Sequence, residues 1–447
     1  MSAFTSPSQP VKVEPRKKTK KKWHIRDDPI TWQNWYKHLN WLHTPVLVST
    51  PCIAIYGLGI TAGSLPFSPH SKFSKPFEKP ADEHQHHIMD LHIFIGYHRL
   101  WAHRSYKASR PFEIFLIFIS SGAVEGSIRW WCRDHRAHHR WTDTERDPYD
   151  AQKGLFYSHF GWMMLKQNPN KIGRADISDL NADPLIMLQN KYYGVFAVVM
   201  GFILPTVVAG LGWGDWRGGF FFAAISRLVF VHHATFCVNS IAHYLGDTPF
   251  DDRHSPRDHF ITAILSLGEG YHNFHHEFPM DYRNAIKFYQ YDPTKWLIKL
   301  LSYFGLTKHL KKFPENEIKK CHLIMKQKKL DDEKAKLDWG TPLNQLPIYT
   351  YEELTHMFKS DEENAKKNNW ICIEGIIHDV TGFMEDHPGG KLLLATALGK
   401  DMTTAFNGGI YDHSNAARNL MSTLRIGVIA GGGEVISRKT KQHNNLN

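Results

Sequence analysis

Long apolar runs interrupt an otherwise polar chain at several places. Residues 193–213, YGVFAVVMGFILPTVVAGLGW, contain no charged side chain, and residues 220–243 make a second apolar run after a short polar loop. A helix needs about 20 apolar residues to cross a bilayer, so both runs predict spanning helices, with a buried helical hairpin of a soluble protein as the alternative. Residues 44–67 are a third candidate span. The apolar run at 111–126 is too short, which predicts an interfacial or buried helix.

Polar segments divide the rest of the chain. Residues 1–43 are basic, with RKKTKKK but no apolar core, which excludes a secretory signal peptide and favours a cytosolic tail over a nucleic-acid-binding arm. The candidate spans then fall within 44–307. Residues 308–345 are rich in lysine and predict a helical or loosely ordered connector. Residues 346–430 mix short apolar runs with helical ones, which predicts a small α+β domain, and 431–447 form a polar tail.

Composition narrows the possible partners. The 447 residues carry a formal charge of +10, which suits nucleic acid, an anionic membrane surface or a phosphate-bearing substrate. No base-stacking or groove-reading motif accompanies the charge, so we expect no nucleic-acid partner. The five cysteines are scattered and form no CxxC pair, which favours a reducing compartment over a disulfide framework.

Histidines gather in four clusters close to the apolar runs. Two clusters, RDHRAHH and YHNFHH, share the spacing HxxHH, which places three imidazoles on one face of a helix. His98 and His103 are five residues apart, so an unbroken α-helix would not point both in one direction. They need a π-bulge or a helix end. The nine clustered histidines are His98, His103, His135, His138, His139, His243, His272, His275 and His276.

Nine imidazoles are too many for one ion and suit two ions with four or five ligands each. Imidazole binds zinc, copper, iron and nickel. The clusters contain no cysteine, which disfavours iron–sulfur and structural zinc sites. Redox-active iron with an open coordination position would permit O₂ chemistry on a C–H bond. Four further histidines lie outside the clusters, and we expect none of them to be a ligand: His232, His233, His254 and His259.

The stretches GYHRLWAHRSYKA, GAVEGSIRWWCRDHRAHHRWTDTERDPY, ATFCVNSIAHYLGDTPFDDRHSPRDH and GEGYHNFHH together resemble the membrane-bound acyl-CoA Δ9 desaturases of the stearoyl-CoA desaturase type, over residues 97–300. The resemblance implies an α-helical integral membrane protein of the endoplasmic reticulum, with four transmembrane helices and a cytosolic helical cap. It also implies a di-iron centre held by the nine histidines, with Asn239 reaching the second iron through a water molecule.

The same resemblance implies the reaction and the substrate contacts. A cis double bond is introduced into a saturated fatty acyl-CoA such as palmitoyl- or stearoyl-CoA, with O₂ as co-substrate. Arg133 and Asp134 would contact the CoA moiety, with Arg129 nearby, and Trp131 would line the bend of the acyl tunnel. A salt bridge confined to Arg133 and Asp134, and a packing role for Trp131, are the alternatives.

The C-terminal unit carries its own pair of histidines. His387 lies in HPGG and His413 follows 26 residues later, so two neutral imidazoles could bind a haem iron from opposite faces. Gly389 and Gly390 would let the backbone turn tightly beside the ring. The unit resembles cytochrome b5, and its fusion is similar to that in fungal Δ9 desaturases. This implies haem b and electrons arriving from NADH through cytochrome b5 reductase.

One segment departs from the desaturase pattern. Residues 68–96 stand where the family has a second transmembrane helix, yet they carry several charges and prolines, which predicts an exposed loop. A cytosolic N-terminus, metal site and haem domain require an even number of spans before His98, and the sequence offers one. Either the sequence is inaccurate in this stretch, for example through an unspliced or misassembled segment, or the enzyme activity of this copy is impaired. Besides a desaturase, we consider a haem-fused fatty acyl or sphingolipid hydroxylase and a non-catalytic desaturase relative.

Overall fold

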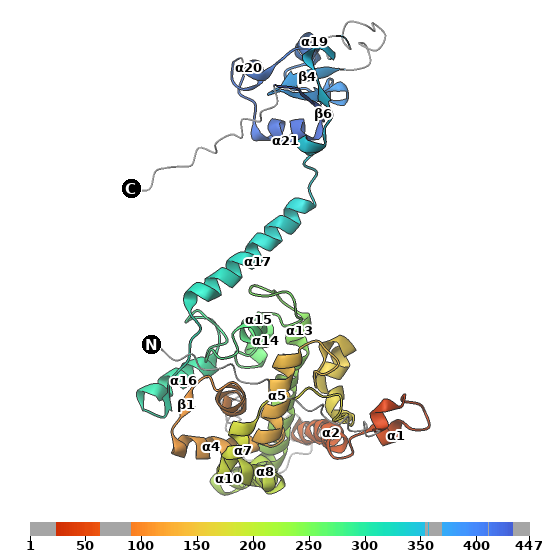
Figure 1. Cartoon of the computed structure of the whole chain (residues 1–447). Helices are drawn as coiled ribbons and strands as arrows, with labels where there is room; N and C mark the ends of the chain where they lie inside the picture. The colour runs from red at the N-terminus through yellow and green to blue at the C-terminus, as the bar shows by residue number, and fades with distance from the viewer. Residues whose placement is uncertain (1–23, 63–90, 354–355, 357–368, 410, 432–447) are drawn as a thin grey trace, which may run out of the picture. The chain divides into compact units, whose positions relative to one another are not determined.

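A computed structural model describes residues 24–62, 91–353, 356, 369–409 and 411–431 (Figure 1). Most of the departing segment, residues 68–90, lies outside the described residues, and so does the greater part of the N-terminal tail. Its last six residues, 91–96, are helical and buried, so the prediction of an exposed loop is wrong for that part: the run LHIFIG is apolar apart from one histidine and packs into the core. The chain divides into two compact units, residues 1–327 and residues 328–447.

The first unit is almost entirely helical. It begins with the short helices η1 (Ile25–Asp27) and α1 (Trp35–His38), followed by α2 (His43–Ala62), the π-helix η2 (Phe94–Ala102), α4 (Arg110–Ser121) and α5 (Ile128–Trp141). A run of short helices follows, namely η3 (Ala151–Lys153), η4 (Tyr157–Gly161), α6 (Trp162–Met164), α7 (Ser178–Ala182) and α8 (Pro184–Lys191). Two-residue strands β1 (Lys107–Ala108) and β2 (Thr307–Lys308) pair antiparallel.

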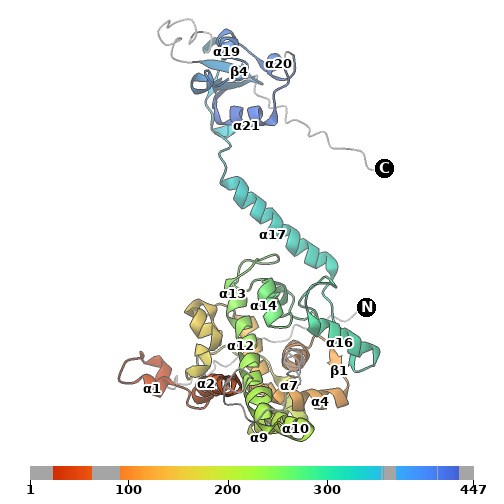
Figure 2. The same ribbon diagram turned by 180° about the vertical axis from the view of Figure 1, so that it is seen from behind.

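In the part of the chain that the structure describes, two helical stretches are long and apolar enough to cross a membrane, as the pattern predicts. The first, Tyr193–Trp213, comprises α9 (Tyr193–Val198), η5 (Val199–Ile203) and α10 (Leu204–Trp213). The second, Trp216–Tyr244, comprises α11 (Trp216–Gly218), η6 (Gly219–Ser226), α12 (Arg227–Asn239) and α13 (Ile241–Tyr244). Only 22% of the apolar window in the first stretch is buried, which disfavours a soluble core helix. Figure 2 shows α12 running from the side of α9 and α10 to α13.

The third candidate span forms helix α2 as far as Ala62, and its last five residues are not described. The short run at 111–126 forms α4, which buries Leu116 and Ile117 while Phe115 and Phe118 stay exposed. An exposed apolar side opposite a buried one fits the expected interfacial or buried helix.

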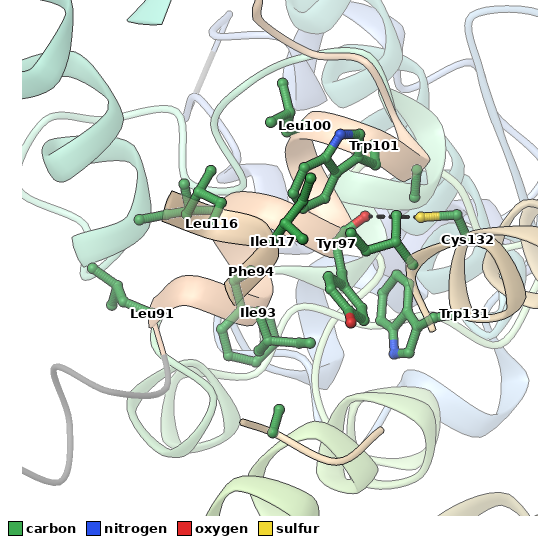
Figure 3. Close-up of a cluster of buried hydrophobic side chains, with 14 of the residues drawn as sticks. Leu91, Ile93, Phe94, Tyr97, Leu100, Trp101, Leu116, Ile117, Trp131 and Cys132 are labelled. Atoms are coloured by element: carbon green, nitrogen blue, oxygen red, sulfur yellow. Dashed lines mark hydrogen bonds between the residues drawn. The ribbon is translucent and has the colours of Figure 1, made fainter. Parts of the chain in front are cut away.

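The core of the first unit surrounds η2. Tyr97 of η2 packs against Trp101 of the same helix and against Trp131 of α5, and the thiol of Cys132 in α5 donates to the carbonyl of Tyr97 at 3.3 Å (Figure 3). Ile93 and Tyr97 are fully buried. This packing fixes the first two histidine clusters relative to each other, because they lie on these same two helices.

The rest of the first unit closes the metal-bearing region. It consists of α14 (Phe260–Leu265), α15 (His272–Glu277), α16 (Pro293–Tyr303) and the start of α17 (Glu315–Ala335). Ile318 of α17 packs into a small core with Phe250, Phe274 and Phe278. The first unit therefore extends into the lysine-rich stretch that the sequence assigns to the connector.

The second unit is a small α+β fold. A 310 turn, η7 (Leu343–Gln345), precedes a four-stranded sheet in the order β3-β6-β5-β4. Its strands are β3 (Ile348–Tyr349), β4 (Trp370–Ile373), β5 (Ile376–Asp379) and β6 (Arg425–Ile429), with β3 parallel to β6 and the other neighbours antiparallel. The helices are η8 (Thr381–Phe383), α19 (Lys391–Ala397), α20 (Thr403–Phe406) and α21 (Asn415–Thr423).

Candidate metal centre and haem site

The π-helix η2 solves the spacing problem of the first histidine cluster. The amide of His103 donates to the carbonyl of His98 at 3.0 Å, a bond between residues five apart. A wider turn of this kind brings positions i and i+5 onto one face. The two imidazole rings lie 4.8 Å apart between centroids. The prediction of a π-type irregularity is confirmed.

Helices α5 and α15 present the two HxxHH sets. Ser127 caps α5 by accepting from the amide of Trp130 at 3.2 Å. At the start of α15, the carboxylate of Asp258 accepts from the amides of Asn273 and Phe274. A carboxylate that binds the free amides of a helix N-terminus fixes where the helix begins and is favoured there by the helix dipole.

The single histidine of the third cluster follows a break in the helix. α12 ends at Asn239, and Ser240 has φ −118° and ψ −77° before α13 carries His243 inward. Ser240 and His243 are buried, and 9% of the surface of Asn239 is exposed. The chain changes direction at Ser240, so Asn239 lies at the end of one helix and His243 on the next.

All nine histidines converge as two groups. The five-histidine group consists of His98, His103, His135, His139 and His275, and the four-histidine group of His138, His243, His272 and His276. In each group one nitrogen per ring lies within 4.8 Å of the corresponding nitrogens of the others. Among the residues that the structure describes, neither group includes the four histidines that the sequence sets aside.

The nitrogens within each group have spacings suited to an ion. In the five-histidine group, Nε2 of His275 lies 3.0 Å from Nε2 of His98 and 3.0 Å from that of His139. In the other group, Nε2 of His272 lies 3.2 Å from that of His243 and 3.0 Å from that of His276. Bonds of about 2.1 Å at right angles place neighbouring ligand nitrogens about 3 Å apart.

Burial prepares these rings to act as ligands. Desolvation is the largest effect on these rings, and repulsion from neighbouring imidazoles is the next largest. Together they lower the pKa of six histidines well below the ordinary value: His103, His135, His139, His272, His275 and His276. A neutral imidazole keeps a lone pair for a metal. The donor set and its spacing therefore fit two transition-metal ions.

Carboxylates hold several of the rings from behind. Nδ1 of His138 donates to both oxygens of Asp147 at 2.9 Å, so its Nε2 carries the lone pair that faces the group. Burial alone would raise the pKa of Asp147, but the contacts with His138 outweigh it and the pKa is lowered. Such outer contacts fix the tautomer and the orientation of a ligand.

His98 and His243 also have polar partners behind their rings, an acidic residue for one and a serine hydroxyl for the other. Nδ1 of His98 lies 2.9 Å from Oε2 of Glu269, a residue that also pairs with Arg99. Nδ1 of His243 bonds Oγ of Ser255 at 2.7 Å, and Ser255 donates to Asp143 at 2.5 Å. The histidine pattern does not predict these supporting residues, although Glu269 stands inside the stretch GEGYHNFHH and Asp143 follows RDHRAHHRW.

The expected substrate residues lie on α5 but do not share one role. Nε of Arg133 donates to Oδ1 of the buried Asp134 at 2.6 Å, and Arg133 also lines a pocket of about 600 Å³. Arg129 instead bonds Asn181 at 2.7 Å. Trp131 stacks on the ring of His135 at 4.8 Å and does not line that pocket. Burial, more than the pairing with Arg133, sets the pKa of Asp134 and raises it.

The pocket beside Arg133 opens between α5, the start of α2 and the loop that follows α6. Its lining includes His43, Trp130, Trp162 and Arg174. Two guanidinium groups among aromatic rings suit a ligand that joins phosphate to a flat heterocycle. Arg174 is a candidate binding residue that the sequence pattern does not predict.

In the second unit, His387 and His413 face each other. Their ring centroids lie 6.5 Å apart with an angle of 31° between the planes. Nδ1 of His413 bonds the carbonyl of Phe406 at 3.0 Å, and Nδ1 of His387 approaches that of Gly390 at 3.4 Å. Each ring thus keeps Nε2 for a ligand. Gly390 has φ +91°, which a residue with a side chain rarely adopts. These residues fit a haem held between two imidazoles.

Comparison with known proteins matches two regions of the chain to known families. Residues 88–309 match the fatty acid desaturase family, and residues 357–430 match the family described as cytochrome b5-like haem/steroid binding domain. The chain is 49% identical to a "Probable acyl-CoA desaturase" of Schizosaccharomyces pombe, over 97% of this chain and 89% of that protein. It is 46% identical to "Acyl-CoA desaturase 1" of Saccharomyces cerevisiae, over 93% of this chain and 78% of that protein.

A further relative matches about half of the chain. "Stearoyl-CoA desaturase 5" of Homo sapiens is 40% identical over 48% of this chain and 67% of that protein. The chain therefore belongs to the acyl-CoA desaturases of the fatty acid desaturase family, in the form that carries a C-terminal cytochrome b5-like domain.

Proposed function

We propose that the chain introduces a cis Δ9 double bond into a saturated fatty acyl-CoA, such as palmitoyl- or stearoyl-CoA, at a di-iron centre held by the nine histidines. The observation that carries this proposal is the convergence of nine imidazole nitrogens as groups of five and four. In its overall balance the reaction removes two hydrogens from adjacent methylene carbons. It consumes O₂, two electrons and two protons, and it yields the alkene and two waters.

Two bound irons would supply the activation of O₂ and the oxidising power for C–H cleavage. The chain's own residues hold and orient this centre. Glu269, Asp147 and Ser255 fix three imidazoles from behind. Six of the nine histidines are buried, which keeps bulk water away from the reacting carbons.

The pocket beside α5 is the proposed site for the CoA moiety. Arg133 and Arg174 would pair with phosphate, while Trp130 and Trp162, whose rings lie 6.2 Å apart and nearly parallel, would contact the adenine. Trp131, stacked on His135, would then guide the acyl chain past the five-histidine group. Arg129 and Asp134 would support the pocket through Asn181 and Arg133.

Electrons would reach the centre through haem b, held between His387 and His413. A six-coordinate haem has no position for O₂ and is suited to electron transfer. The proposed external partner is NADH-cytochrome b5 reductase. The proposed division of the chain assigns 346–430 to the haem domain, 44–307 to the desaturase domain and 308–345 to the connection.

The proposed location is the endoplasmic reticulum membrane, with four transmembrane helices, a helical cap, and the N-terminus and both cofactor sites in the cytosol. The hairpin of Tyr193–Trp213 and Trp216–Tyr244 supports this arrangement, because a hairpin returns to its own side. Arg227 inside the second stretch is buried and donates to the carbonyls of Gly122 and Gly201, as a charge at membrane depth requires.

Product analysis tests the proposal. The full chain, reconstituted with reductase, NADH and stearoyl-CoA, should yield a Δ9 alkene by gas chromatography of the fatty acid esters. A hydroxy acid would identify a hydroxylase, and no product with an intact haem spectrum would identify a non-catalytic relative. Either result would overturn the proposal.

A further inference from the structure

His159, a histidine outside the nine, contacts the break between α12 and α13. It lies on the π-helix η4, and its Nδ1 is 2.8 Å from Oγ of Ser240. Ser240 is fully buried and is the residue at which the helix changes direction. No histidine pattern in the sequence singles out His159, because it stands alone in FYSHFGW.

The direction of each hydrogen bond in this chain of contacts follows from counting protons. The hydroxyl of Ser240 has one proton, which it donates to the carbonyl of Phe236 at 2.7 Å. The contact with His159 must therefore be a bond from Nδ1–H to Oγ. Burial, assisted by His233, lowers the pKa of His159 to about 4, so the ring is neutral and has one N–H.

The second nitrogen of His159 is then an acceptor. Nε2 lies 2.9 Å from Nδ1 of His233, which must donate to it. His233 thus selects the tautomer in which His159 binds Ser240. The result is a directed series of donors that runs from His233 through His159 and Ser240 to Phe236.

This series of hydrogen bonds fixes Ser240, which lies three residues before the metal-site residue His243. A serine that bonds the carbonyl four residues earlier bends a helix, but its hydroxyl has other rotamers available. A second bond to Oγ removes that freedom. The amide of His243 donates to the carbonyl of Ser240 at 2.9 Å, so a shift of Ser240 would also move His243, which belongs to the four-histidine group.

We propose that His159 is a positioning residue for the four-histidine metal site, acting through Ser240 on His243. This inference rests on the proposed di-iron function. A ligand displaced by a few tenths of an ångström binds its metal less tightly, and losses of outer contacts lower metal affinity by about 10- to 100-fold. Because α13 contributes to the four-histidine group alone, the effect should be confined to one ion.

The competing interpretation is that His159 only fills space. Its ring centroid lies 5.6 Å from those of Phe160 and Phe236, so an aromatic replacement would pack well there. Two substitutions separate the interpretations. His159→Phe keeps the ring and loses the donor, whereas His159→Asn loses the ring and keeps an N–H near the position of Nδ1.

The measurement is iron per haem in the purified full chain, with the haem as internal standard. The wild type should hold two irons per haem. His159→Phe and Ser240→Ala should each lose iron toward one per haem, their double variant should lose no more than either, and His159→Asn should stay near two. The haem spectrum should be unchanged throughout, because its ligands lie in the other unit.

Three outcomes would overturn the inference. One is a Phe variant that keeps two irons, another is an Asn variant that loses as much as the Phe variant, and the third is loss of both irons together. A wild type with fewer than two irons would instead refute the di-iron proposal and this inference with it.

Discussion

Arg99 offers the sharpest test of how the five-histidine group is supported. Its side chain is 1% exposed, and its guanidinium donates to Oε1 of Glu269 at 2.7 Å and to Oδ1 of Asp292 at 2.9 Å. Nη1 also donates to the carbonyl of Tyr282 at 2.8 Å. With Lys295, which is 4% exposed, the buried set contains two cations and two carboxylates. It is therefore neutral only while Arg99 is present.

Replacing Arg99 with methionine should destabilise the first unit strongly. Glu269 and Asp292 would stay buried with an uncompensated negative charge, and breaking a buried pair in this way costs about 3–5 kcal/mol. A domain of this size loses about 2–4 °C of melting temperature per kcal/mol, so we expect a drop of about 6–20 °C. Tryptophan fluorescence in detergent would follow the first unit, while haem absorbance would follow the second and should not move.

Two further variants decide whether charge is the cause. Arg99→Met combined with Glu269→Gln restores neutrality, so the double variant should melt above Arg99→Met alone. Arg104→Met is the matched control, because that guanidinium is 53% exposed and its ion pair with Asp179 should contribute about 1 kcal/mol or less. Two results would contradict this explanation: a melting temperature of Arg99→Met within 2 °C of the wild type, or a double variant that melts at a lower temperature than Arg99→Met.

Four other outcomes follow from the same geometry. His272→Ala should lower iron content and abolish desaturation with the haem spectrum intact, and retained Δ9 product in a reconstituted assay would disprove the metal assignment. His413→Ala should remove the b5-type absorbance and NADH-driven turnover, partly restored by separate cytochrome b5; undiminished turnover in a strain without free cytochrome b5 would contradict the internal donor role. Burial lowers the pKa of His378 from its usual 6.5 to about 4, so between those pH values only the unfolded chain binds a proton at this ring. The free energy of unfolding of the haem unit should therefore fall by about 3 kcal/mol as the pH drops from 6.5 to 4. Haem retention in urea would measure this pH dependence, and His378→Asn should remove it. Arg133→Ala should raise KM for acyl-CoA about tenfold with little change in kcat, and an unchanged KM would remove Arg133 from the CoA site.

Helical periodicity makes six of the nine histidines, those of the two HxxHH sets, predictable from the sequence. HxxHH places its three rings on one face whatever the rest of the chain does, and α5 and α15 both form helices there. The five-residue spacing of His98 and His103 is informative for the same reason. A regular helix fails to bring them together, so the sequence requires an irregularity, and η2 supplies it as a π-helix.

The supporting residues could not be predicted in this way. Glu269, Asp147 and Ser255 reach their histidines across loops, and no periodicity relates a loop carboxylate to a ring 171 residues away along the chain, as from His98 to Glu269. His159 and Arg174 are similar cases. Each is a single polar residue in an ordinary stretch, and only the folded chain reveals its partner.

The sharing of α5 and α15 between the two groups explains why the two ions should behave as one centre. On a helix, position i+4 lies about 40° from i on one side and i+3 about 60° on the other. In α5 the i and i+4 rings, His135 and His139, join the five-histidine group while the i+3 ring, His138, joins the other.

In α15 the division is reversed. His272 and His276, at i and i+4, join the four-histidine group, and His275 crosses to the five-histidine group. A rotation of either helix would therefore displace ligands of both proposed ions. By contrast, η2 and α13 each serve one group, so a change at His103 or at the Ser240 break can weaken one ion and leave the other in place. The HxxHH spacing that makes the centre recognisable in the sequence thus links the five-histidine group to the four-histidine group. Only substitutions on the helices outside that pattern, η2 and α13, should affect one group without the other.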